Sequence, residues 1–165
     1  MGLLLILVIG LMGGCSTSLK EQQDEAAKKV SEALSEQPKA AKKTAKNVYF
    51  YLPFGMKIKK ESPNNIIMNR GRQNYLLFYN QKEAETSKEV YKISKLNKRL
   101  LVDKTFSSNK RFGYLLISKV KKDLYEVIVG VGGIKMTTET SMKNIASDSE
   151  KMAKVVSSVK YKSTK

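Results

Sequence analysis

The alternation of apolar and polar residues divides the chain into an apolar leader, a polar helical segment and a longer region of short apolar runs. Residues 1–14 carry no charged side chain, and the segment from Leu19 to about Lys46 is rich in Ala, Lys, Glu and Gln. From Asn47 onward, short apolar runs alternate with Gly, Pro and Asn positions, a pattern typical of strands joined by tight turns. It predicts strands near 48–52, 56–60, 66–69, 75–79, 99–106, 112–120, 124–131 and 134–138.

Three segments are predicted to be helical. A second helix is expected over about 80–96, because Asn80 and Glu83 have capping-box spacing. The third, over roughly 141–159, has apolar residues at alternating steps of three and four, which predicts one buried face and one lysine-rich face. The first of the three helices, nearest the N-terminus, is predicted to lie before Pro38. Its narrow apolar stripe consists mostly of alanine. The residues of that stripe are Ala26, Ala27, Val30, Ala33 and Leu34.

Several predicted strands are apolar at both alternating sets of positions. This holds for YLLFY at 75–79, for YLLI at 114–117 and for residues 125–131. A strand with one solvated face would alternate apolar with polar residues, so we expect these strands to be covered on both faces. The expected fold class is α+β, with a mainly antiparallel sheet covered by helices on both faces as an α/β/α sandwich.

The region from about Asn47 to Tyr161 resembles the PsbP-like domains. The likeness rests on the order of elements, on the LPFG turn at Leu52–Gly55 and on a long terminal helix that ends in SSVKY. That superfamily includes extrinsic photosystem II subunits and many bacterial lipoproteins. The resemblance implies an α/β/α sandwich that acts in binding or assembly, and it supplies no catalytic residues.

The leader, MGLLLILVIGLMGG, is too short for a transmembrane helix and has the length of a signal-peptide core. It ends in Gly-Gly-Cys-Ser, which resembles the lipobox cut by lipoprotein signal peptidase, although Met12 stands where that family usually has Leu. The resemblance implies a signal peptide over residues 1–14 and a diacylglyceryl group on Cys15, and two acyl chains give stable anchoring. The recognition positions would be Leu11, Met12, Gly13 and Gly14.

Two other interpretations of the leader stay open. Cys15 could be a small apolar residue at the end of a buried helix, or the segment could be an uncleaved anchor. Myristoylation at Gly2 is excluded, because Ile6 stands where Ser or Thr is required.

The predicted organisation is a signal peptide (1–14), a lipidated N-terminus with a helical spacer (15–46) and a basic α+β domain (47–165). We expect the spacer to be a semi-rigid tether that holds the domain off the membrane. The alternative is that its helix pairs with a partner or packs on the domain. Because the strong apolar patterns all lie beyond it, the domain is expected to fold without the spacer.

The net charge of the chain limits the classes of partner that it is expected to bind. The sequence has 31 Lys+Arg and 15 Asp+Glu, a formal net charge of +16, and 24 of these basic residues and 10 of the acidic ones lie in 47–165. Such a field indicates an anionic partner, namely anionic lipid, a cell-wall polymer or a membrane protein. Predicted export argues against nucleic acid. The alternative is that evenly spread lysines only keep the domain soluble.

No catalytic arrangement emerges from the sequence. There is no His and a single Cys, which excludes a Cys/His zinc site and an internal disulfide and removes the usual general base. The glycine-rich stretch 130–133 lacks the spacing of a nucleotide-binding loop and predicts a bulge or tight turn. Glu83, Glu85 and Glu89 stand among lysines and predict a solvated face. We expect no metal and no cofactor.

Four basic residues near the start of the domain are candidates for binding an anionic partner: Lys57, Lys59, Arg70 and Arg72. They are interleaved with aromatic residues, which could form a stacking platform with basic rims. Strand alternation places at most half of these aromatics on one face, so we favour core aromatics instead. The aromatics are Tyr49, Phe50, Tyr51, Phe54, Tyr75, Phe78 and Tyr79.

Together these features predict a lipid-anchored protein on the extracytoplasmic face of the cell membrane. It is expected to be a non-enzymatic binding module for an anionic surface, polymer or protein partner. The alternative is a structural or accessory subunit of a membrane-associated assembly, and an enzyme ranks third. Basic residues clustered on one face would favour the first, and a large exposed apolar patch would favour the second.

Overall fold

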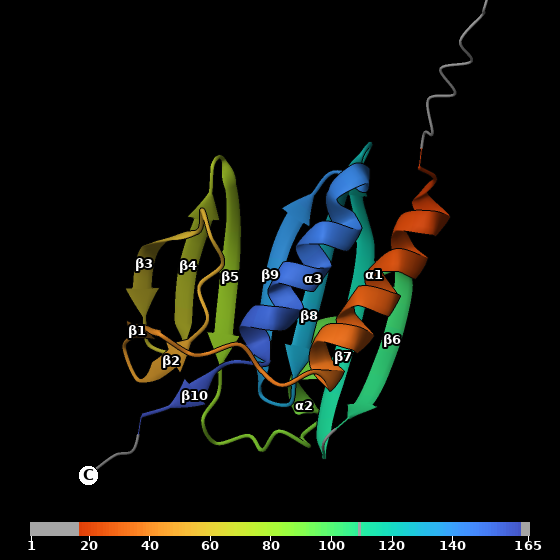
Figure 1. Ribbon diagram of the computed structural model, residues 1–165. Coiled ribbons are helices and arrows are strands. Elements are labelled where there is room, and N and C mark those ends of the chain that lie inside the picture. The colour runs from red at the N-terminus through yellow and green to blue at the C-terminus, as the bar shows by residue number, and fades with distance from the viewer. Residues whose placement is uncertain (1–16, 109, 163–165) are drawn as a thin grey trace, which may run out of the picture.

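The structure is a computed structural model that describes residues 17–108 and 110–162. The leader, with its recognition positions Leu11, Met12, Gly13 and Gly14 and the predicted lipidation site Cys15, lies outside the described residues. Within them, three α-helices and ten strands form an α+β fold (Figure 1). The predicted α+β class and the mainly antiparallel sheet are confirmed.

Seven strands form one antiparallel sheet in the order β3-β4-β5-β9-β8-β7-β6, and three short strands form a second sheet in the order β1-β2-β10. All eight predicted strands are present; the sequence analysis missed only β1 and β10, which are three and two residues long. The bounds are β1 (Lys43–Ala45), β2 (Val48–Phe50), β3 (Lys57–Ser62), β4 (Asn65–Arg70), β5 (Gln73–Tyr79), β6 (Leu100–Ser108), β7 (Arg111–Lys121), β8 (Leu124–Val131), β9 (Ile134–Thr140) and β10 (Lys160–Tyr161).

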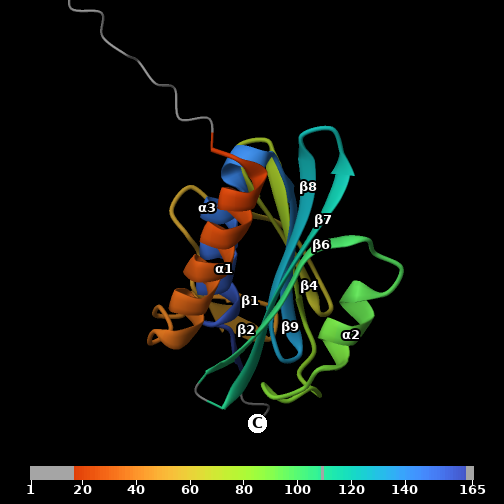
Figure 2. The same ribbon diagram turned by 90° about the vertical axis from the view of Figure 1, so that its right-hand side faces the viewer.

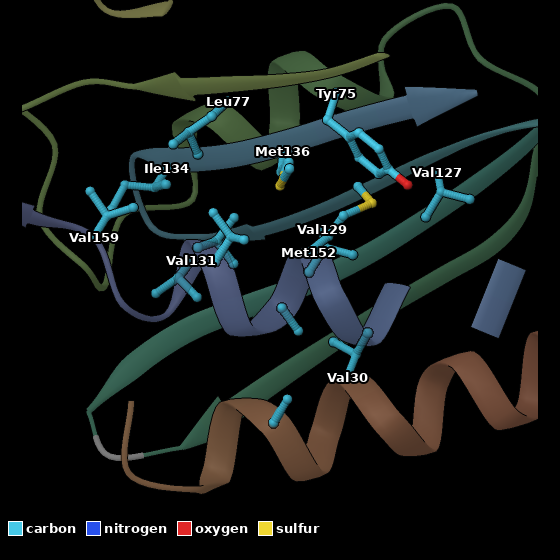
Figure 3. Packing of buried hydrophobic residues seen from close by; sticks show 14 of the residues in the cluster. Val30, Tyr75, Leu77, Val127, Val129, Val131, Ile134, Met136, Met152 and Val159 are labelled. Carbon is cyan, nitrogen blue, oxygen red and sulfur yellow. The ribbon is translucent and has the colours of Figure 1, made fainter. Parts of the chain in front are cut away.

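The main core lies between the large sheet and two helices, α1 (Leu19–Ser35) and α3 (Ile145–Val156), which lie side by side over the same face (Figures 1 and 2). A 3-10 turn, η1 (Met142–Asn144), leads into α3. Ile145 and Met152 of α3 are fully buried, as the predicted apolar face requires. Figure 3 shows Met152 facing the sheet residues Val129 and Met136.

The helix α1 is part of this core and is not a free tether. Ala26 and Val30 are completely buried, and Gln22 accepts a hydrogen bond from the Ala146 amide of α3 at 3.2 Å. At the other end of α1, the Arg111 guanidinium donates to the Leu34 carbonyl at 3.1 Å. The favoured interpretation of residues 15–46 as a spacer therefore does not hold for Leu19–Ser35. The apolar stripe of α1 consists mostly of alanine, and these small side chains let α1 and α3 pack closely.

The opposite face of the sheet carries a smaller cluster, in which Phe112 and Tyr114 of β7 pack with Ile128 of β8. The helix α2 (Glu89–Lys95) lies on this side of the sheet (Figure 2), and its Tyr91 ring is 5.3 Å from that of Phe112. The strands β7 and β8 are thus buried on both faces, as predicted. The prediction is wrong for β5, because α2 does not reach it and Leu76 is 38% exposed.

The predicted helix over 80–96 is confirmed only for its last part, because residues 80–88 are irregular. Asn80 does not cap a helix; its side chain accepts from the Lys82 amide at 3.1 Å, two residues on, as in an Asx turn. The Asn80 amide donates to the Gly133 carbonyl at 3.0 Å, and the Phe112 amide to the Glu85 carbonyl at 2.8 Å. These contacts with β7 and with the β8–β9 turn hold the segment in an irregular path with two turns, so the helix predicted from the local capping pattern does not form there.

Candidate functional site

The four predicted anion-binding residues all lie at one edge of the large sheet. Lys57 and Lys59 belong to β3, which is an edge strand, while Arg70 ends β4 and Arg72 lies in the following turn. Lys57 pairs with Asn69 and Arg70 with Gln73, so Lys57, Arg70 and Arg72 gather at one corner. Lys59 falls in the register shift of β3, farther along the edge. All four side chains are exposed.

Phe54 adds an apolar side chain to this corner and is 98% exposed. It lies in a turn closed by a hydrogen bond from the Met56 amide to the Pro53 carbonyl, and the next residue, Gly55, has a φ of +81°. A Cβ on Gly55 would lie 3.5 Å from Arg70 Nε, so the LPFG turn packs beside Arg70. The turn that carries the exposed Phe54 ring therefore packs beside Arg70.

The positive charge of the corner is not neutralised within the protein. Among the ion pairs of residues 17–108 and 110–162, none involves Lys57, Lys59, Arg70 or Arg72. In contrast, Lys29 and Lys154 both pair with Glu150 between the helices. The basic corner is thus available for an external anion.

The preferred interpretation of core aromatics is confirmed for three of the seven rings, while Tyr51 and Phe78 are half-buried and Tyr49 and Phe54 are exposed. Phe50, Tyr75 and Tyr79 are buried, and Figure 3 shows Tyr75 and Leu77 in the core. Phe78, on the other face of β5, lies under Lys135, whose Nζ is 5.9 Å from the ring centroid. Phe54 remains as the fully exposed ring at the basic corner.

A buried carboxylate that the sequence analysis did not single out fixes the position of this corner. Asp148, in the first turn of α3, accepts hydrogen bonds from Tyr75 at 3.0 Å, Gln73 at 3.0 Å and Thr140 at 2.7 Å. Burial and the neighbouring Asp148 raise the pKa of the Tyr75 hydroxyl, so Tyr75 stays a donor. Since Gln73 directly follows Arg72, this network holds the β4–β5 turn against α3.

The uncovered part of the sheet face forms an open groove of about 530 Å³. Ile67 and Leu76 are paired across β4 and β5 and form its floor together with Thr137 of β9. Its rims carry opposite charges, because Lys59 and Lys60 lie on one side and Glu126 and Glu139 on the other. It is a shallow amphipathic surface. Its two acids, Glu126 and Glu139, are register partners on β8 and β9, and Glu126 forms an ion pair with Lys98.

Lys135 is the lysine that comes nearest to a catalytic arrangement. Its Nζ donates to the Ser94 hydroxyl at 3.0 Å, and burial, with Lys98 nearby, lowers its pKa. Ser94, however, is a buried residue of α2 and is only 3% exposed. The contact therefore holds α2 on the sheet and offers no accessible nucleophile.

The remaining candidate groups do not converge. Glu83 accepts a hydrogen bond from the Ser87 hydroxyl and Glu89 pairs with Lys92, while the glycine-rich stretch ends β8 and continues into the β8–β9 turn at Gly132 and Gly133. In the part of the chain that the structure covers, no group of three or more acidic or Cys side chains could hold a metal ion. No helix among the described residues is long and apolar enough to span a membrane.

Comparison with known proteins adds little. No family model and no curated protein matches the chain. A crystal structure from Bacteroides thetaiotaomicron VPI-5482 at 1.50 Å resolution is similar over 70% of this chain and 45% of that one, with 11% identity and a TM-score of 0.38. The chain thus spans less than half the length of that protein, and a likeness at this level carries no argument.

Proposed function

We propose that the protein is a non-enzymatic binding module, anchored through lipid on Cys15 to the extracytoplasmic face of the cell membrane, that binds an anionic surface. The observation that carries this proposal is the basic corner, where the exposed Arg70 and Arg72 have no acidic partner among the described residues and the turn with the exposed Phe54 packs beside Arg70. Arginine binds phosphate groups through its planar set of donors, and an aromatic ring suits the membrane interface.

Simple electrostatics gives the size of the effect. A basic side chain close to an anionic membrane contributes about 1 kcal/mol, and the attraction decays over roughly 8 Å at physiological salt. A corner with three or four such residues therefore gives weak binding by itself. Two acyl chains on the same protein would make the attachment stable and keep the domain within reach of the surface.

Vesicle binding by the chain that begins at Ser16 tests this proposal, because that chain lacks the lipid and keeps every helix and strand of the described residues. We expect it to cosediment with vesicles that contain phosphatidylglycerol, not with neutral phosphatidylcholine vesicles, and to dissociate as salt rises. The Arg70→Gln/Arg72→Gln variant should bind at least tenfold more weakly. Lys104→Gln/Lys110→Gln removes the same charge from exposed positions elsewhere and is the matched control. Absence of binding to anionic vesicles at low salt would refute the proposal.

A structural or accessory subunit is the second candidate function, and one observation favours it. Ile93 and Leu96, three residues apart in and just after α2, are each 64% exposed. They offer a small apolar contact for a protein partner. Pull-down from native membranes with the intact chain and with Ile93→Ser/Leu96→Ser would test this, since loss of a specific partner only in the variant supports the subunit role.

We also propose that the fold is a PsbP-like α/β/α sandwich. The position of α1 and α3 on one face and of Tyr91 in α2 against the other supports this description. The LPFG turn beside Arg70 is in keeping with the resemblance noted in the sequence. An experimental structure that superposes on PsbP-like domains with the same strand order would test it.

A further inference from the structure

The β4–β5 and β7–β8 turns lie at the same end of the molecule, although 45 residues or more separate them in the sequence. Thr140 at the end of β9 pairs with Tyr125 of β8, which pairs with Lys119 of β7. The pairing of β5 with β9 brings Gln73, next to Arg72, to the same end, where it shares Asp148 with Thr140. We call this end, formed by residues 70–73, 119–124 and 140–146, the proximal end.

The β7–β8 turn carries a basic group that the sequence analysis did not select. Lys119, Lys121 and Lys122 are exposed, and within the described residues none of them forms an ion pair. Val120 lies at a register shift between β7 and β8 and is 48% exposed. The one acid of the turn, Asp123, accepts a hydrogen bond from the Met142 amide at 3.3 Å. The turn thus presents an apolar residue flanked by free lysines.

The helix α1 begins at this same end. Its first turn contacts the first turn of α3 through Gln22 and Ala146, and Figures 1 and 2 show both helices starting at the end of the molecule that carries the two turns. Ser18 caps α1 by a reciprocal pair of bonds with Glu21. Only Ser16 and Thr17 separate Ser18 from Cys15, so at full extension about 10 Å joins the two Cα atoms.

We propose that the proximal end is the membrane-facing end, and that Lys119–Lys122 form a second contact with anionic phospholipid beside Arg70 and Arg72. This inference rests on the proposed function. Exposed lysines also occur at the opposite end, among them Lys82, Lys110 and Lys160, so charge alone does not orient the domain. The short connection to a lipid on Cys15 orients the domain, because α1 is packed into the core. The end of the domain at which α1 begins must therefore lie close to the anchor.

A single tryptophan tests the orientation, since the chain has none of its own. The lipid-modified full chain with Val120→Trp is reconstituted in vesicles of phosphatidylcholine with or without phosphatidylglycerol. In anionic vesicles we expect a blue-shifted emission that lipids brominated in their acyl chains quench. Ile93→Trp on α2, the matched exposed position away from this end, should show neither effect.

Charge variants separate this inference from the proposed function. In the Val120→Trp chain, Lys119→Glu/Lys121→Glu/Lys122→Glu should abolish the blue shift, whereas Lys82→Glu/Lys110→Glu/Lys160→Glu should leave it. An unshifted Val120→Trp emission, or equal loss in both triple variants, overturns the inference. The proposed function falls instead if the unlipidated chain fails to bind anionic vesicles at all.

Discussion

Leu34 of α1 lies directly against Gly113 of β7, where the sheet makes room for the helix by lacking a side chain. A Cβ at position 113 would be 2.5 Å from Leu34 Cδ1, closer than real Cβ contacts allow. Leu34 is buried, and the Arg111 guanidinium donates to its carbonyl. This contact joins the N-terminal helix to the start of β7, next to the edge strand β6 of the large sheet, and makes α1 part of the domain.

Gly113→Ala should therefore lower the free energy of unfolding by about 1–3 kcal/mol, because the methyl group overpacks the α1–β7 contact. Combined with Leu34→Ala, which removes the clashing atoms, the two losses should not add. Urea unfolding of the single and double variants measures this. Thr105→Ala on the neighbouring strand is exposed and serves as the control. Strict additivity would show that the two sites do not touch.

A chain that begins at Asn47 should not unfold cooperatively, contrary to the expectation from the sequence. It lacks α1, whose buried residues Ala26, Val30 and Leu34 cover α3 and part of the sheet, and it lacks β1. Loss of that helix exposes apolar surface, so an aggregated or molten product is expected. Circular dichroism during urea titration of this chain and of the chain that begins at Ser16 tests this prediction. A sharp transition in the shorter chain would contradict the assignment of α1 to the core.

Asp148→Ala should destabilise the protein by about 3 kcal/mol, because it strands buried donors on Tyr75, Gln73 and Thr140. Unlike Asp148, Glu139 is exposed, and Glu139→Ala should change stability by less than about 0.5 kcal/mol. Chemical denaturation of both variants provides the comparison. Equal stabilities would mean that the network does not hold α3 to the sheet.

Ionisation of the Tyr161 hydroxyl should make the protein less stable in alkaline solution. Burial, with Tyr79 and Glu85 nearby, raises the pKa of Tyr161 to about 12, against about 10 in an unfolded chain. Between these values the folded state binds more protons than the unfolded state, so the free energy of unfolding falls as pH rises above about 10.

Tyr161→Phe should reduce this alkaline loss. At neutral pH it should cost little, since the Tyr161 hydroxyl has no hydrogen-bond partner within the described residues. Stability measured from pH 7 to 11.5 tests both points. Tyr49→Phe, at an exposed position, should leave the pH profile unchanged, and a profile insensitive to Tyr161→Phe would exclude the effect.

Cys15→Ala should release the protein from the membrane fraction or leave it as an unprocessed precursor, because no other thiol exists to carry the lipid. Mass spectrometry of the membrane-bound mature protein should find residue 15 at the N-terminus with acyl chains attached. Ser16→Ala keeps the cysteine and should be processed normally. An intact, unmodified Cys15 in the membrane-bound protein would rule out lipid anchoring.

Local pattern was sufficient for the strands and for α3. Apolar residues at both alternating sets of positions predicted that β7 and β8 are buried on both faces. Apolar residues spaced three and four apart predicted the buried face of α3. These predictions succeed because, on a regular strand or helix, the positions that face the core carry apolar side chains and the positions that face solvent carry polar ones. The four basic candidates are exposed, and their role in binding an anion stays a prediction; the sequence could not show that three of them meet at one corner.

Tertiary structure decided what each surface faces. The alanine stripe of α1 is compatible with a tether or with close helix packing, and only the presence of α3 and of the gap at Gly113 selects packing. Leu76 stays exposed because α2 is too short to cover β5, a matter of element length that alternation does not encode. The meeting of Arg72, Lys119 and the start of α1 at one end follows from strand order and register, which depend on pairings between residues far apart in the chain.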